Sequence, residues 1–186
     1  MLWPDMPESP EISLPAVRRR FDRVSATFDE ADFVHRQTFA GLLERLSPVV
    51  VEHERILDIG SATGSGTDAL ARTYRRSHVI ALDISRPMLA RARRRGSFLA
   101  RPGAVQGDAR ALPFRNASID LAVANVLLPW VDRPETLFAE LARVLEPGGV
   151  FAFATLGPDS FALLQAAWAA GDSGPHAAAF AGRRLT

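Results

Sequence analysis

Short apolar runs alternate with segments of helical periodicity over most of the chain, and this alternation restricts the fold more than any other feature. The apolar runs are RILDI, HVIALDI, GAVQGD, SIDLAVAN and VFAFATL, between residues 55 and 156. Runs of this length with helical segments among them predict an α/β fold, a doubly wound and mostly parallel sheet with helices on both faces. SIDLAVAN is apolar on both alternating faces, so we expect that strand to be buried on both sides.

The helical segments between these runs carry start signals. The first should run from the glycine-rich turn to about Arg76. The second follows Ser85, a good capping residue, with Pro87 in its first turn. The third starts where Asp132 and Glu135 can form a capping box. The residues expected to face the core are Met88, Leu89, Ala92, Leu137, Leu141, Val144 and Leu145.

Ahead of the first strand, apolar residues recur at helical spacing up to Leu46. Phe21, Val24 and Phe28 fall at i, i+3 and i+7, which predicts a helical extension of two helices. A last helix is expected over residues 160–170. The predicted organisation is a flexible N-terminus (1–15), a domain (16–171) that begins with the extension (16–47), and an irregular C-terminal tail (172–186).

Composition and charge exclude several classes of protein. Hydrophobic residues make up 47% of the 186 residues, enough to build one packed domain and to exclude global disorder. The net charge of +1 predicts neither a nucleic-acid nor a membrane-surface partner. The chain has no cysteine, no signal-peptide pattern and no apolar run long enough for a bilayer, so we expect a soluble cytoplasmic protein. The oligomeric state is left open.

Polar residues stand at the carboxyl end of every predicted strand. They are Asp58, Asp83, Asp108, Asn125 and Thr155. In doubly wound sheets, ligands bind beyond the carboxyl ends of the strands, at the point where the strand order reverses. The sequence therefore predicts a ligand site at this edge of the sheet.

The glycine-rich segment DIGSATGSG, which begins at Asp58, fits two ligand-binding patterns. Asp58-x-Gly60-x-x-x-Gly64 resembles the loop that holds S-adenosylmethionine, whereas Gly64-x-Gly66-x-x-Ala69 fits the dinucleotide pattern. Glycines there allow positive φ and close approach of a ligand to the backbone. A third interpretation is a strand-to-helix turn that needs glycine only for its geometry.

The position of the first glycine argues against a dinucleotide. In dinucleotide folds the first glycine follows the strand almost at once, but Gly64 comes four residues after Gly60. In the earlier register, Ala62 and Ser65 occupy the places of the second and third glycines. We therefore interpret the dinucleotide match as accidental, and Gly66 as the opening of the helix.

Two further carboxylates suit an adenosine group. Asp83 can accept both ribose hydroxyls, a role common to both cofactors, or it can simply assist Ser85 in capping a helix. In GDARALPF, Asp108 can accept the adenine amino group and the apolar residues can pack near the ring. The alternative for that segment is a polar loop with a hydrophobic anchor.

The segments ILDIGSATG, ALDISRPML, GDARALPF, IDLAVAN, RVLEPGG and FAFATLGPDSF resemble, in order and spacing, the class I S-adenosylmethionine-dependent methyltransferases. This resemblance covers residues 17–171 and implies a Rossmann-like fold with S-adenosyl-L-methionine as cofactor. The extension, ANVLLPWV and TLGPDSFALLQAAW are more narrowly similar to the malonyl-acyl-carrier-protein O-methyltransferases of biotin synthesis. The mitochondrial complex I assembly relatives of these methyltransferases share much of this pattern, but their chemistry is different, the hydroxylation of arginine in a protein.

The resemblance implies a set of cofactor-binding residues. The methionine end would be held by the loop from Asp58, the ribose by Asp83 and its neighbour, and the adenine by residues further along, with Asn125 near the sulfonium. Gln37 and the rest of the extension would act as a lid. The implied set is Asp58, Gly60, Ser61, Ala62, Gly64, Asp83, Ile84, Met88, Asp108, Ala109 and Asn125.

Some features depart from the family pattern. Ala62 replaces a usual glycine, Phe28 replaces a common tyrosine, and Pro129 replaces a glutamine or histidine before Trp130. The family's C-terminal strand pair is missing, which predicts either a fragment or another cover for the fifth strand. The four histidines show no metal-ligand spacing, and no metal is expected. The arginine runs at 18–20 and 91–95 fit either an anionic carrier protein or solvated helix surfaces.

The working hypothesis is O-methylation of a carboxylate on an acyl-carrier-protein-bound malonyl group. An ionised carboxylate needs no general base, in keeping with the lack of a recognisable catalytic residue. The alternatives are a methyltransferase acting on another small molecule and a non-catalytic cofactor-binding or assembly module.

Overall fold

Five parallel strands form one sheet in the part of the chain that the computed structural model describes, residues 13–48, 54–95, 102–157 and 160. The strand order is β3-β2-β1-β4-β5, and every neighbouring pair is parallel. This order confirms the predicted doubly wound topology, with its reversal between β1 and β4. The strands are β1 (Arg55–Ile59), β2 (His78–Asp83), β3 (Gly103–Gln106), β4 (Ile119–Asn125) and β5 (Leu145–Ala154).

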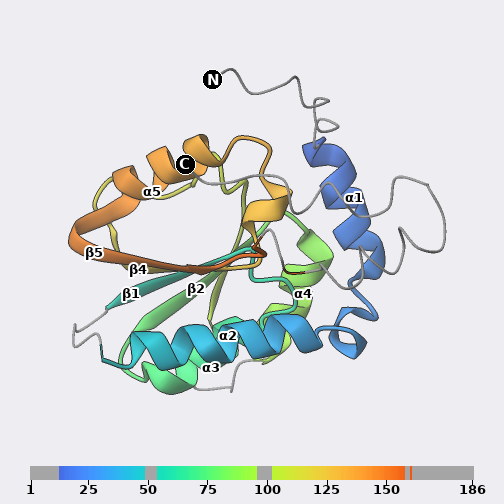
Figure 1. Cartoon of the computed structure of the whole chain (residues 1–186), viewed down its shortest axis with the longest axis horizontal. Coiled ribbons are helices and arrows are strands. Elements are labelled where there is room, and N and C mark those ends of the chain that lie inside the picture. Colours follow the sequence, from blue (N-terminus) through green and yellow to red (C-terminus); the bar gives the residue numbers. More distant parts are fainter. Residues whose placement is uncertain (1–12, 49–53, 96–101, 158–159, 161–186) are drawn as a thin grey trace.

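Helices cover both faces of the sheet, as Figure 1 shows. Alternate residues of β1 and β4 point to opposite faces, so each strand supplies two hydrophobic clusters. One cluster joins Leu57 and Ala122 to α5 (Pro134–Val144). The other joins Ile56 and Leu121 to α2 (Phe33–Leu46) and α3 (Ser65–Thr73). Central β4 is buried on both sides, as predicted.

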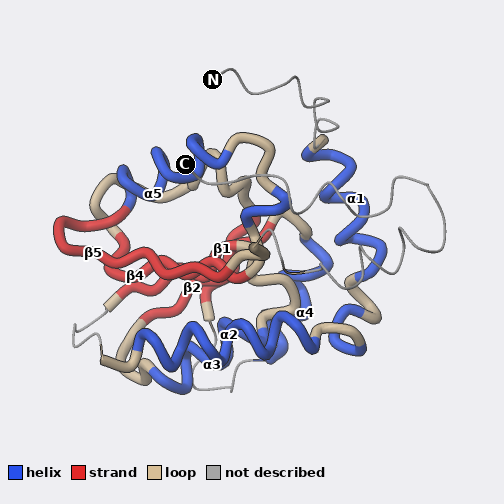
Figure 2. Tube along the Cα trace, viewed as in Figure 1, coloured by secondary structure: helices blue, strands red, loops and turns tan. Residues whose placement is uncertain are grey.

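The N-terminal extension contains the two predicted helices, α1 (Leu14–Val24) and α2, joined by a 3₁₀ turn (Phe28–Glu30). α1 begins two residues earlier than expected because Pro15 fits the first turn of a helix. α1 packs against α4 (Arg86–Arg95), whereas α2 packs against α3 and β5. Figure 2 shows α2 running beneath the sheet and α1 standing beside the ends of the strands.

Local signals were less reliable than periodicity. The predicted capping box at α5 is wrong: Arg133 occupies the N-cap position without a side-chain cap, and Asp132 instead accepts a hydrogen bond from Arg110 at 2.7 Å. Leu145 begins β5 instead of continuing α5, and it packs against the core, partly buried, as expected. The EPGG segment is an irregularity within β5, where Gly148 has a φ of +84°.

Several predicted segments lie outside the described residues: most of the flexible N-terminus, the last helix beyond Ser160, and the C-terminal tail. Among the helices that are described, none is long and apolar enough to cross a membrane.

Gly66 has a packing role that the sequence did not indicate. It is the second residue of α3, and a Cβ atom built on it would lie 2.5 Å from the ring of Phe39 in α2. Phe39 is only 6% exposed, so its ring has little room to move. The missing side chain therefore sets how closely α2 approaches α3.

Replacing Gly66 with alanine should lower the free energy of unfolding by about 1–2 kcal/mol, because overpacking outweighs the gain in helix propensity. Gly41→Ala in α2 is the matched control. Its added Cβ would meet only the mobile end of Arg45, at 3.2 Å, so it should be neutral or stabilising by up to about 1 kcal/mol. Urea unfolding measures both; equal stability of Gly66→Ala and the parent would contradict this tight packing.

Candidate functional site

The turn after β1 has a shape that requires glycine at two positions. Gly60 and Gly64 adopt φ values of +72° and +83°, in the left-handed region. A Cβ atom at Gly60 would lie 2.9 Å from Leu127, and one at Gly64 would lie 2.6 Å from Ala92. Both positions therefore require glycine, because the backbone is left-handed and because there is no room for a side chain. This agrees with the register predicted from the sequence.

Ala62 is also left-handed, with a φ of +47°. This is the position where the family pattern has a glycine, so the alanine carries some backbone strain. Its amide is held in place, because it donates a 2.8 Å hydrogen bond to Oδ2 of Asp83. The substitution is accommodated without loss of the turn.

Asp83 joins the turns that follow two neighbouring strands. Oδ2 accepts the amide of Ala62 and Oδ1 accepts the amide of Ser85, both at 2.8 Å. Burial raises the pKa of Asp83, the amide hydrogen bonds oppose that rise, and nearby Asp22 adds to it. The capping alternative is thus partly realised: the amides of Ala62, Ile84 and Ser85 use three of the about four acceptor sites of the carboxylate, which leaves capacity for a further donor such as a ligand hydroxyl.

Asp58 is a nearly enclosed carboxyl group, 2% exposed. Its Oδ2 accepts a 2.6 Å hydrogen bond from Thr67 of α3. Burial raises the pKa of Asp58 to about 7; the Thr67 bond lowers it, and the charge of Asp83 raises it further. Near neutral pH this group is therefore poised between its two charge states, and a cation beside it would favour the ionised one.

Two contiguous cavities lie between the extension and the carboxyl ends of the strands. The larger is about 80 Å³ and the smaller about 30 Å³. Asp83, Ile84, Asp108 and Ala109 line the larger one. Asp58 and Ser61 line the smaller one. Both are lined by Phe28, His35, Gly60, Ala62 and Asn125.

Three buried polar atoms around the smaller cavity lack hydrogen-bond partners among the described residues. They are Ser61 Oγ, Asn125 Oδ1 and His35 Nδ1. The side chain of Asn125 is oriented by a 2.8 Å bond from its Nδ2 to the backbone oxygen of His35. Burial lowers the pKa of His35, so the ring is neutral at pH 7. Because unpaired buried polar groups are costly, such a cluster points to a polar ligand.

The structure brings together all but two of the predicted site residues. Gly64 packs on α4, and Met88 is fully buried; neither lines the two cavities. Gln37, the proposed lid residue, is exposed and also lines neither. Both oxygens of Asp108 are engaged by Arg110, so its adenine role remains a prediction.

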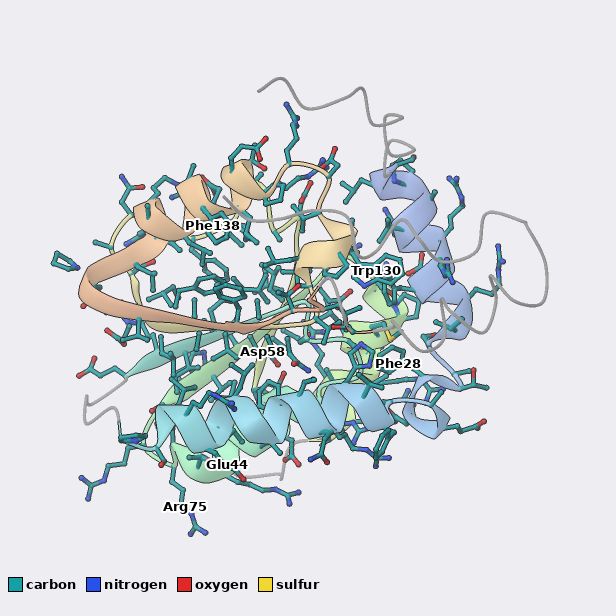
Figure 3. All side chains as sticks on the ribbon, viewed as in Figure 1. Phe28, Glu44, Asp58, Arg75, Trp130 and Phe138 are labelled. Carbon is teal, nitrogen blue, oxygen red and sulfur yellow. The ribbon has the colours of Figure 1, made fainter. Side chains whose placement is uncertain are left out.

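Sequence reasoning missed several cavity residues. His35, Phe21 and Trp130 line the larger cavity, and the Phe21 and Trp130 rings meet edge to face at 5.0 Å. Figure 3 shows Phe28 and Trp130 near α1, with Asp58 closer to the centre of the sheet. No sequence signal identifies these partners, because they depend on where the extension docks on the sheet.

A doubly wound parallel sheet, a glycine turn with an enclosed acid, and a second acid at the end of β2 together define an α/β domain for an adenosine-containing ligand. The methyltransferase-domain family matches residues 57–153, more than half of the chain. The chain therefore belongs to this family.

Relatives carry a more specific name. The malonyl-[acyl-carrier protein] O-methyltransferase of Halorhodospira halophila is 41% identical over 162 residues, 87% of this chain and 55% of that protein. The protein of the same name from a Methylovorus species is 40% identical, over 81% of this chain and 53% of that protein. The chain thus spans about half the length of these relatives.

Solved structures agree with the fold. A SAM-dependent methyltransferase of Thermotoga maritima has a TM-score of 0.63 at 25% identity, covering 80% of this chain and 66% of that chain. Phosphoethanolamine N-methyltransferase 2 of Haemonchus contortus, solved with S-adenosyl-L-methionine, has a TM-score of 0.61 at 26% identity, covering 74% and 35%.

Replacing Asp58 with asparagine should flatten the dependence of stability on pH. The folded-state pKa of about 7 lies above the ordinary 3.8, so the unfolded chain releases this proton first. The contribution of Asp58 to stability is therefore complete below about pH 3.8 and is lost as the pH rises towards 7. Between pH 5 and 8 this loss is about 2–3 kcal/mol, and Asp58→Asn should remove it.

Denaturant unfolding of both proteins at pH 5 and pH 8 measures the effect. Asp68→Asn, which breaks a surface ion pair with Arg72 in α3, is the control and should leave the pH dependence almost unchanged. If Asp58→Asn shows the same loss between pH 5 and 8 as the parent, Asp58 does not have a raised pKa.

Proposed function

We propose that this domain binds S-adenosyl-L-methionine in the two contiguous cavities and transfers its methyl group to an acceptor. The observation that carries the proposal is the smaller cavity, where Ser61 Oγ and Asn125 Oδ1 lack partners beside the enclosed carboxyl of Asp58. Acceptor oxygens gathered around an acid suit the cationic amino group of a methionine moiety. Family membership supports the same ligand.

The residue roles follow from the two cavities. Asp58 and Ser61 would hold the methionine end, with Gly60 and Gly64 keeping the turn open. Asp83 would accept the ribose hydroxyls in the larger cavity. Ile84, Asp108 and Ala109 would surround the adenine, and Met88 would support it from beneath. The residues shared by both cavities would then lie at the sulfonium, where the reaction occurs.

The acceptor we propose is the free carboxylate of a malonyl group on an acyl carrier protein, as the names of the relatives suggest. A carboxylate oxygen attacks the methyl carbon, the carbon–sulfur bond breaks, and its electron pair remains on sulfur. No proton moves in this step, so the protein need only orient the reactants and exclude water. A neutral His35 and the aromatic wall of Phe21, Phe28 and Trp130 fit such a site.

A ligand titration tests the cofactor. S-adenosylhomocysteine at a hundredfold excess over its Kd should stabilise the protein by about 2.7 kcal/mol, whereas NAD should not. Asp83→Ala should lose this shift because the ribose loses its acceptor, and Asp68→Asn should keep it. The measurement is thermal unfolding with and without each ligand. No shift with S-adenosylhomocysteine would remove the basis of the proposal.

A methyl-transfer assay tests the acceptor. With radiolabelled S-adenosyl-L-methionine, label should pass to malonyl-acyl carrier protein and be released by base as methanol, because the product is an ester. The matched control is the same carrier with the malonyl group already esterified, which has no free carboxylate and should take no label. If the protein binds the cofactor but labels neither carrier, another acceptor or a non-catalytic binding role replaces the malonyl proposal.

A further inference from the structure

The extension is fastened to the sheet through two carboxylates that do not line either cavity. Asp22 of α1 and Asp29 of the 3₁₀ turn reach across to the turns after β2 and β1, respectively. These two turns carry several of the proposed ligand residues, including Gly60, Ser61 and Ile84. The points of attachment therefore coincide with the parts of the core that a ligand would contact.

Asp29 makes the more extensive attachment. Its Oδ1 accepts a 2.5 Å hydrogen bond from Oγ1 of Thr63, which lies between Ala62 and Gly64 in the glycine turn and is fully buried. Its Oδ2 pairs with Arg95 at the end of α4. Arg95 also donates to the backbone oxygen of Thr63 at 2.8 Å. One carboxylate thus joins the extension, the glycine turn and α4.

Asp22 makes a second attachment next to Asp83. Its Oδ1 accepts a 2.6 Å hydrogen bond from Oγ of Ser85, whose amide donates to Asp83. This bond holds α1 over the turn after β2. It also brings a second acid near Asp83, whose pKa it helps to raise.

The extension forms one wall of the larger cavity, through Leu14, Val17, Phe21 and Phe28. The opposite wall is formed by the turns after the strands, including Gly60, Asp83 and Asp108. A ligand held between these walls cannot leave sideways through the sheet, which is packed on both faces. Movement of the extension away from the turns would widen the path of release, and this movement breaks the bonds of Asp22 and Asp29.

We propose that Asp29 and Asp22 form a latch that holds the extension closed over the bound ligand, with Asp29 as the positioning residue that couples closure to the glycine turn. The nature of the ligand rests on the proposed function, but the latch itself rests on the bonds to Thr63, Arg95 and Ser85. Asp29 acts through Thr63, so its loss should shorten the time a ligand stays bound without removing any ligand contact.

Asp29 is the better residue to test. Its side chain is 41% exposed and that of Arg95 is 33% exposed, so breaking the pair leaves no buried charge. Exposed ion pairs contribute little, and most of the effect should come from the charged hydrogen bond to buried Thr63. Changing Asp22 would also alter the pKa of Asp83 and would confuse the result.

The experiment compares Asp29→Asn with Glu30→Gln, an exposed acid one residue further along the same turn. The dissociation rate of S-adenosylhomocysteine should rise roughly three- to tenfold in Asp29→Asn and stay unchanged in Glu30→Gln, while association changes little. Trypsin cleaves this lysine-free chain only after arginine. With the ligand bound, cleavage within α1, after Arg20 and Arg23, should accelerate by a similar factor in Asp29→Asn alone.

A double-mutant cycle separates a latch from a general loss of stability. Thr63→Val, which removes the donor, should raise the dissociation rate as Asp29→Asn does, which removes the charge of the acceptor. The two changes together should add little more, because both act on the same charged hydrogen bond. Equal dissociation and cleavage rates in Asp29→Asn and Glu30→Gln, or fully additive effects in the cycle, would overturn the latch.

The outcome remains readable if the proposed function fails. Should the parent protein not bind S-adenosylhomocysteine, the cofactor proposal falls, and the latch is judged from cleavage of α1 without ligand. Faster cleavage of Asp29→Asn than of Glu30→Gln then supports the latch, and equal cleavage rejects it.

Discussion

The carboxylate of Asp83 is the link on which the site depends. One oxygen binds the amide of Ala62 and the other binds the amide of Ser85, so a single side chain sets the turn after β1 against the turn after β2. Backbone hydrogen bonds also tie the turn after β1 to β2, because the amides of Gly60 and Ser61 donate to the oxygen of Leu82. A buried amide needs an acceptor and a buried carboxylate needs donors. The hydrogen bonds of Asp83 therefore allow its carboxylate and the amides of Ala62 and Ser85 to be buried together. The strained alanine at position 62 persists within this arrangement.

The site also concentrates negative charge where water has little access. Burial raises the free-energy cost of ionising Asp58 and Asp83. The negative charge of Asp22 raises that cost further at Asp83. Without a cation, this arrangement costs stability near neutral pH. With a cationic ligand the same carboxylates gain a partner, so the free energy lost in folding becomes available for binding. In the same way, Ser61 Oγ and Asn125 Oδ1 cost stability while they lack hydrogen-bond partners, and a ligand that donates to them would recover that free energy.

The sequence predicted the sheet and the edge that carries the site, because both depend on periodicity and strand ends. RILDI matches β1 residue for residue, and Asp83 and Asn125 end β2 and β4 as expected. The failures arise where a side chain meets a distant segment. Asp132 binds Arg110 instead of capping its own helix, and a local signal cannot anticipate such competition.

The same reason explains the residues that were missed. His35 lines the cavity because the extension docks on the sheet, Trp130 meets Phe21 of the extension there, and Gly66 is needed because Phe39 packs against it. These contacts join segments separated by tens of residues, and neither partner carries a distinctive local pattern.

The extension completes the site rather than simply preceding it. α2 is seated against α3 by the contact between Phe39 and Gly66, on the face of the sheet opposite α5. This packing positions His35, which lies on the same helix. The backbone oxygen of His35 then accepts a hydrogen bond that orients Asn125 at the end of β4. The orientation of a core side chain thus depends on a helix from outside the sheet. Packing of Phe39 against Gly66, both of which line the smaller cavity, therefore helps to determine the geometry of the polar atoms that face a ligand.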